Sequence, residues 1–84
     1  MENNLRKVEM LVVFDPNGKI RPFRFRVPGS DGSLYVVTII NILFSEEVQR
    51  DLIKFRCECI IQDKKKTLDI YYKKLSMEWL IYLK

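Results

Sequence analysis

The sequence predicts a mainly β fold, a six-stranded antiparallel meander that curls into a small barrel, with one short helix between the third and fourth strands. Apolar and polar residues alternate in several short segments, most clearly in Pro22-Phe23-Arg24-Phe25-Arg26-Val27, as in strands with one buried face. Turn-forming residues separate these segments. With 84 residues, 48% of them hydrophobic, the chain is expected to form one packed domain over residues 1–84.

The first two strands, Leu5–Asp15 and Lys19–Val27, are expected to form a hairpin. Between them, Asp15-Pro16-Asn17-Gly18 predicts a tight turn, because proline fixes a negative φ, Asp15 accepts backbone N–H groups and glycine adopts the left-handed conformation. Three side chains of the first strand share one face: Met10, Val12 and Phe14. The second strand is expected to turn its aromatic side chains inward and its guanidinium groups outward.

The third strand and the helix follow a polar loop. Leu34–Phe44 is rich in β-branched residues, which favours a strand over a buried helix. Ser45–Leu52 begins with a serine that can cap a helix and continues with two acids, which suit the positive end of a helix. We therefore expect one or two helical turns there.

Three further strands complete the predicted sheet, over Ile53–Gln62, Thr67–Lys73 and Met77–Lys84. Their alternation predicts which side chains face the core. These are Phe55, Cys57, Cys59 and Ile61 on the fourth strand, Leu68, Ile70 and Tyr72 on the fifth, and Trp79, Ile81 and Leu83 on the sixth. Closure into a barrel would remove exposed strand edges.

The segment from Asp15 to Arg26 resembles the first hairpin of a family of small uncharacterised β-rich proteins from Gram-positive bacteria. Such proteins share a glycine turn, a proline and a phenylalanine-arginine strand. Phe55-Arg56-Cys57 and the closing Trp79-Leu80-Ile81-Tyr82 are similar too. The resemblance implies a β fold and a bacterial cytoplasmic setting, and it transfers no functional residue.

The composition argues against an enzyme. The chain has no histidine, which excludes histidine-based acid–base catalysis, and it shows no nucleophile elbow or phosphate loop. Cys57 and Cys59 would lie about 7 Å apart on one face of a strand, and without further ligands they do not make a zinc site. We expect them to be core thiols, the alternative being a redox pair. No catalytic residue, metal or cofactor is predicted.

A basic outer face is the first candidate binding surface. The chain has a net charge of +4, and its outward basic and aromatic residues would gather if their strands were neighbours. These are Arg24, Arg26, Lys54, Arg56, Tyr71 and Lys73. Such a surface suits nucleic acid or an acidic protein. The alternative is that these groups solvate the outside of the sheet, which Glu58 and Asp69 on the same faces favour.

An apolar outer patch is the second candidate. The first and last strands would meet in a closed barrel and bring together Leu11, Val13, Leu80 and Tyr82. This patch predicts a homodimeric interaction protein, unless the helix or the N-terminal residues cover it. The polar residues 1–4 do not resemble a signal peptide, and no apolar run approaches the length of a membrane helix, so we expect a cytoplasmic protein without membrane contact.

Overall fold

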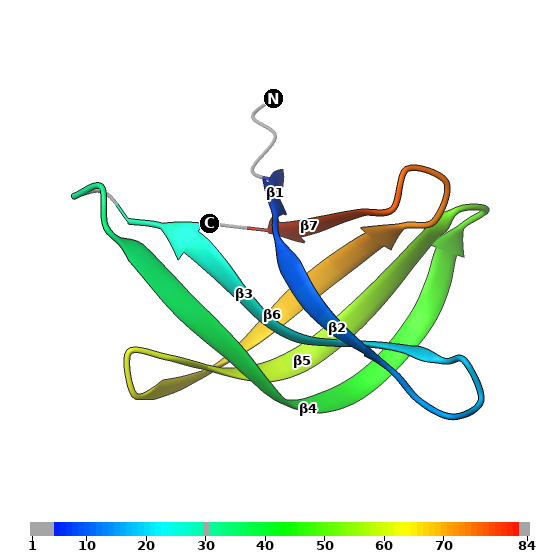
Figure 1. Cartoon of the computed structure of the whole chain (residues 1–84), viewed down its shortest axis with the longest axis horizontal. Helices are drawn as coiled ribbons and strands as arrows, with labels where there is room; N and C mark the ends of the chain where they lie inside the picture. The colour runs from blue at the N-terminus through cyan, green and yellow to red at the C-terminus, as the bar shows by residue number, and fades with distance from the viewer. Residues whose placement is uncertain (1–4, 30, 83–84) are drawn as a thin grey trace.

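The computed structural model of the chain describes residues 5–29 and 31–82, which form one antiparallel sheet (Figure 1). The strands are β1 (Leu5–Val8), β2 (Met10–Phe14), β3 (Ile20–Pro28), β4 (Leu34–Gln49), β5 (Leu52–Ile61), β6 (Lys64–Lys73) and β7 (Glu78–Tyr82). Their order across the sheet is β1-β7-β6-β5-β4-β3-β2, and the sheet curls into a half-barrel. The predicted mainly β, antiparallel and curled architecture is therefore confirmed.

The strand expected over Leu5–Asp15 is interrupted at Glu9 and forms two strands. β1 pairs with β7, the last strand, whereas β2 pairs with β3. Figure 1 shows the two blue strands following one another across the open side of the curled sheet. One continuous segment thus supplies both edge strands, which is why the sheet has seven strands instead of the predicted six.

The helix expected over Ser45–Leu52 is wrong. β4 continues through Ser45 to Gln49, and a turn leads directly into β5. Glu46 lies opposite Lys54, and the Glu47 carboxylate accepts a hydrogen bond from Lys74. The local preference of a capping serine and two acids for a helix is weak, and strand pairing that gives each acid a nearby lysine outweighs it. In the described part of the chain, no helix could cross a membrane.

The turn of the first hairpin has the predicted form. The Asp15 carboxylate accepts hydrogen bonds of 2.9 Å from the backbone N–H groups of Asn17 and Lys19. Gly18 has a φ of 81°, in the left-handed region that glycine adopts without steric penalty. This turn sets the direction in which β3 returns along β2.

A β-bulge in β3 alters the predicted faces of the hairpin. Leu11 lies opposite Arg24 but Val12 lies opposite Pro22, so Phe23 is an extra residue without a partner. Pro22 and Phe25 are buried as a result, whereas Phe23 is 41% exposed. The expectation that Phe23 faces the core is therefore wrong. Phe14, also expected inside, is 64% exposed at the end of β2.

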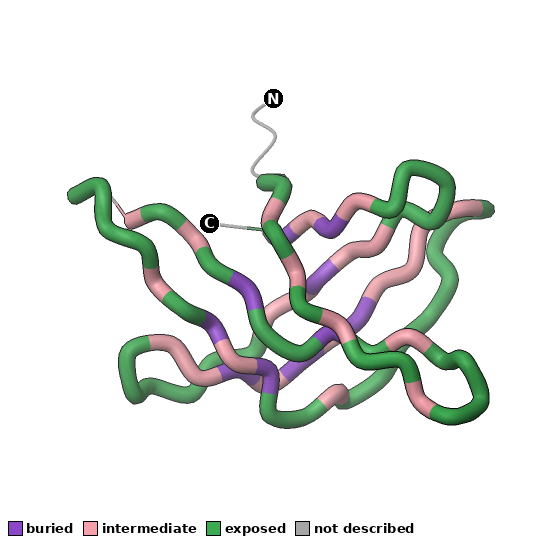
Figure 2. The backbone as a smooth tube through the Cα atoms, in the orientation of Figure 1, coloured by how far each residue is buried: buried purple, intermediate pink, exposed green. Residues whose placement is uncertain are grey.

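The core lies inside the curl and draws on β3 to β7 (Figure 2). Its buried hydrophobic residues are Phe25, Val37, Ile39, Phe55, Cys57, Cys59, Ile70, Trp79 and Ile81. The ring centroid of Trp79 lies 4.5 Å from that of Tyr72 and 5.7 Å from that of Phe55, so the three rings pack as one cluster. The inward positions predicted for β5 to β7 are confirmed, except that Leu83 lies outside the described residues.

Replacement of Ile70 by alanine tests the position of the core. The Ile70 side chain is fully buried, so Ile70→Ala should lower the free energy of unfolding by about 2–5 kcal/mol. Leu75 is 86% exposed, and Leu75→Ala should change it by less than about 0.5 kcal/mol. Urea unfolding followed by tryptophan fluorescence measures both. Equal losses for the two variants would contradict this core.

Candidate functional site

The strand order divides the predicted basic face into two separate groups. Arg24 and Arg26 lie on β3, whereas Lys54 and Arg56 lie on β5 and Tyr71 and Lys73 on β6. β4 runs between these groups. Opposite Arg24 and Arg26 it places Thr38 and Val36, which carry no charge. The six residues therefore do not form one continuous stripe.

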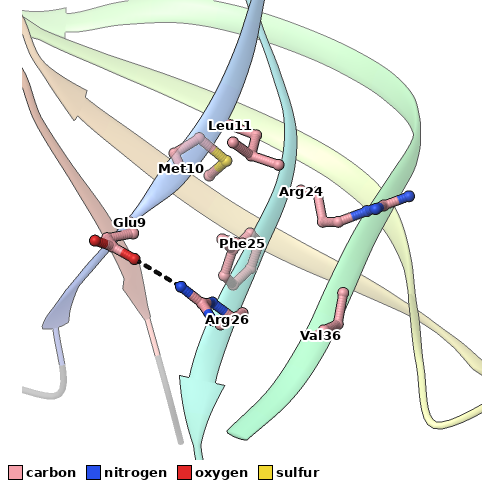
Figure 3. A pocket seen from close by; sticks show the side chains of 7 residues that line it. All are labelled: Glu9, Met10, Leu11, Arg24, Phe25, Arg26 and Val36. Atoms are coloured by element: carbon pink, nitrogen blue, oxygen red, sulfur yellow. Dashed lines mark hydrogen bonds and ion pairs between the residues drawn. The ribbon is translucent and has the colours of Figure 1, made fainter.

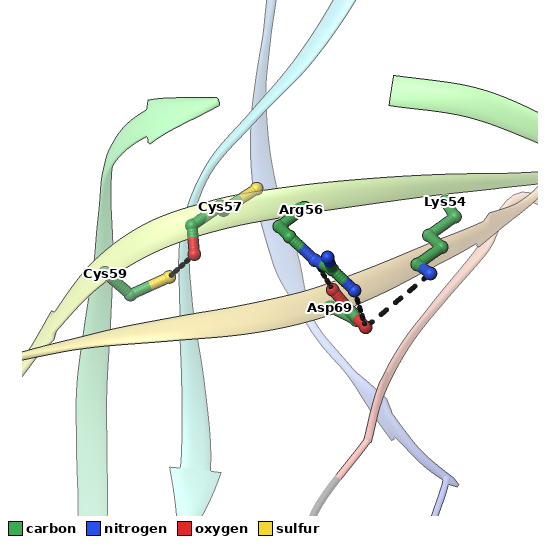
Figure 4. Close-up of polar contacts among 5 residues, drawn as sticks. All are labelled: Lys54, Arg56, Cys57, Cys59 and Asp69. Atoms are coloured by element: carbon green, nitrogen blue, oxygen red, sulfur yellow. Dashed lines mark hydrogen bonds and ion pairs between the residues drawn. The ribbon is translucent and has the colours of Figure 1, made fainter. Parts of the chain in front are cut away.

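The group on β5 and β6 is neutralised by a carboxylate (Figure 4). Arg56 donates two hydrogen bonds to Asp69, of 2.8 and 3.1 Å, and Lys54 Nζ lies 3.8 Å from the same carboxylate. These hydrogen bonds and charges hold the pKa of Asp69 below its ordinary value and raise that of Arg56. Two cations thus share one acid, which leaves less positive potential for an outside ligand.

The remaining members of this group have mixed surroundings. Tyr71 lies between Lys54 on β5 and Leu80 on β7. Lys73 lies between Leu52 and Glu78. The guanidinium carbon of Arg56 lies 5.2 Å from the centre of the Phe44 ring, so its outer surface is partly occupied by a neighbour of its own chain.

The two arginines of β3 line a cavity of about 460 Å³ (Figure 3). The cavity forms near Glu9, where the chain passes from its pairing with β7 to its pairing with β3. Arg26 donates a 3.0 Å hydrogen bond to the Glu9 carboxylate, whereas Arg24 forms no ion pair within the described residues. Figure 3 shows the Arg26 side chain pointing to Glu9 and the Arg24 guanidinium directed away from it, toward β4. We call these two arginines and the cavity the Arg24–Arg26 site.

The ion pair in this site is weak, so it leaves Arg26 accessible. The side chains of Arg26 and Glu9 are 56% and 86% exposed, and exposed ion pairs contribute at most about 1 kcal/mol. An incoming carboxylate can therefore compete with Glu9 for the guanidinium group. Because arginine presents a planar fork of donors, it binds carboxylates in a bidentate manner.

Apolar side chains surround the arginines. Leu11 on β2 is 60% exposed and Val36 on β4 is 48% exposed, and both line the cavity. Phe23 lies beneath Arg24, whose guanidinium carbon is 5.0 Å from the ring centre. Sequence reasoning found the two arginines but missed Glu9, Met10 and Val36, because the three strands that meet here are brought together by the whole sheet.

The predicted apolar patch is divided as well. Leu80 and Tyr82 lie on β7 beside Lys7 and Leu5 of β1. Leu11 and Val13 lie on β2, opposite Arg24 and Arg21 of β3. The first and last strands do meet, but the interruption at Glu9 carries Leu11 and Val13 away from β7 to the opposite edge strand.

Cys57 and Cys59 are free thiols without exposed surface. Desolvation in the core raises their pKa to about 12 and about 11 (Figure 4). Both thiols are therefore protonated at neutral pH, when they act as small apolar groups. Among the described residues, no group of three or more His, Cys, Asp or Glu side chains could hold a metal ion.

The fold and site together define a small curled β-sheet protein with an arginine-containing, partly apolar surface cavity. Comparison with protein-family models, with curated proteins and with solved structures finds no match.

The Asp69 carboxylate should make folding sensitive to acid. Its pKa is lower in the folded protein than in the unfolded chain, so the unfolded chain binds the proton first as the pH falls. The stabilisation is complete above the ordinary value of 3.8 and is lost as the pH falls below it. Unfolding measured between pH 7 and pH 2 should show wild type more stable than Asp69→Asn at neutral pH, with the difference shrinking in acid. A difference independent of pH would contradict this role.

The cysteines should resist alkylation in the native state. Because the thiolate is the reactive form and the pKa of both thiols is raised, iodoacetamide at pH 8 should label neither residue until the protein unfolds. Mass spectrometry with and without urea measures the labelling. Rapid labelling of the folded protein would show that these thiols are accessible.

Proposed function

We propose that this protein is a non-enzymatic cytoplasmic binding module, and that its Arg24–Arg26 site takes an acidic segment of a protein partner. One observation carries the proposal. Arg24 has no carboxylate partner among the described residues, and it stands at a cavity bordered by exposed Leu11 and Val36. A cation beside exposed aliphatic groups is typical of a surface that binds a carboxylate and an apolar side chain together.

The surroundings favour a protein over a nucleic acid. Nucleic acid binding depends on several free cations for phosphates and on exposed aromatic rings for bases. Here Asp69 occupies Arg56 and Lys54, and Arg24 itself covers one side of Phe23. The groups next to Arg24 and Arg26 are mainly aliphatic. They suit leucine, isoleucine or valine side chains of a peptide better than they suit a phosphate backbone.

The contribution of Arg24 can be measured with selected peptides. Display of random peptides against the wild-type protein should enrich sequences with Asp or Glu next to an aliphatic residue. In fluorescence anisotropy, Arg24→Glu should weaken binding of such a peptide at least about tenfold, because the variant puts an acid opposite an acid. Higher salt should weaken wild-type binding as well. Arg50→Glu changes the net charge equally in the exposed turn between β4 and β5, far along β4 from the residue opposite Arg24, and it should have little effect.

Two results would overturn the proposal. Enriched peptides without acids, or equal weakening by Arg24→Glu and Arg50→Glu, would show that the Arg24–Arg26 site does not recognise a carboxylate. Salt-dependent binding of a single-stranded oligonucleotide that Arg24→Glu abolishes, with no peptide bound, would assign the site to nucleic acid instead.

A further inference from the structure

β3 and β4 pair over only part of their length. Their register runs from Pro28 opposite Leu34 to Arg24 opposite Thr38. Beyond this point the two strands separate, and a cavity of about 380 Å³ lies between residues 21–23 of β3 and 39–42 of β4. Within the described part of the chain, residues 39–49 of β4 therefore pair with β5 alone.

Three residues of this half-paired segment have no partner in β5. The register passes over Ile40, Leu43 and Val48, each of which is a bulge residue. All three are aliphatic and between 41% and 49% exposed. Bulges prevent a long ladder of backbone hydrogen bonds along this edge. Another molecule would therefore contact this edge mainly through these side chains.

Residues 39–45 of the same segment belong to the longest stretch of the chain without charge. Residues 32–45 contain no Asp, Glu, Lys or Arg, although 31% of the whole chain is charged. Two copies of a protein with a net charge of +4 repel each other on average. They can approach more readily where few cations lie, and this stretch of β4 itself carries none.

Opposite charges lie next to the uncharged stretch. Arg21 lines the cavity beside Ile40, and Glu46 follows the uncharged stretch. Neither residue forms an ion pair with any described residue, although Glu46 lies opposite Lys54 and its charge adds to that of Asp69 in raising the pKa of Arg56. If a second copy lies antiparallel with its two-fold axis near Leu43, Ile40 faces Glu46 of the second copy. The same arrangement brings Arg21 to that carboxylate.

We propose that the surface formed by Phe23, Ile40 and Leu43 is the contact surface of a homodimer, with Arg21 and Glu46 pairing across it. An isologous contact of this kind uses the same residues on both copies, as most soluble homodimers do. It differs from the contact predicted by Leu11, Val13, Leu80 and Tyr82.

Sedimentation equilibrium tests the dimer directly. The wild-type protein should dimerise. Ile40→Glu with Leu43→Lys should weaken dimerisation at least about tenfold, because in this arrangement the variant places an acid opposite Glu46 of the second copy and two lysines next to each other at the two-fold axis. Leu75→Lys adds charge at a residue that is 86% exposed on the β6–β7 turn, and it should leave the dimer unchanged. Circular dichroism shows whether the double variant folds. If it does not, Ile40→Thr with Leu43→Thr places residues that favour strands at both positions and should weaken dimerisation in the same direction.

A charge exchange tests the arrangement of the two copies. Arg21→Glu should weaken dimerisation, and adding Glu46→Arg to it should restore the affinity, since the pair is then reversed. A wild-type protein that stays monomeric up to about 1 mM would overturn the proposal, because its dissociation constant for dimerisation would be far weaker than that of a functional dimer. Equal weakening of dimerisation by the Ile40 and Leu43 double variant and by Leu75→Lys would also overturn it. So would a charge exchange that does not restore the affinity.

Discussion

The interruption of strand pairing at Glu9 is the constraint on which the rest of the fold depends. An open seven-stranded sheet presents two unpaired edges, each a site for unwanted pairing. Here one segment on either side of Glu9 supplies both edge strands, so the sheet must curl until β7 and β3 lie within reach of it. That curl brings Phe25 and Ile81, from strands far apart in the sheet order, into one core. It also forms the cavity of the Arg24–Arg26 site, which lies at the interruption itself.

The sequence predicted the faces of β5 and β6 because these two strands pair with each other without bulges. β5 and β6 keep a regular register throughout, so the alternation of Phe55, Cys57 and Cys59 follows the structure residue for residue. In β3 and β4, extra residues shift the alternation, and Phe23 lies outside where simple alternation places it inside. Alternation cannot reveal a bulge, because the curvature that requires it arises from the whole sheet.

The candidate sites were predictable as single side chains but not as groups. Arg24, Arg26 and Arg56 alternate with core residues, and the alternation identifies them as outward. Whether they form one surface depends on the strand order, which places β4 between β3 and β5. The helix predicted over Ser45–Leu52 was wrong for the same reason, because strand pairing was not visible in the local sequence. A capping serine followed by acids favours a helix locally, but the pairing of β4 with β5 over that segment involves residues that no local pattern identifies.

Curvature and exposed apolar surface have a common origin in this protein. A sheet that curls this strongly needs bulges, and each bulge adds a side chain that the alternation of inner and outer faces does not place in the core. Phe23, Ile40, Leu43 and Val48 are such residues, and all four are apolar and exposed. Polar residues would satisfy the same backbone geometry and would cause less exposure of apolar surface to water. The apolar character of these positions is therefore not explained by the fold, and the proposed contact between two copies would account for it at Phe23, Ile40 and Leu43.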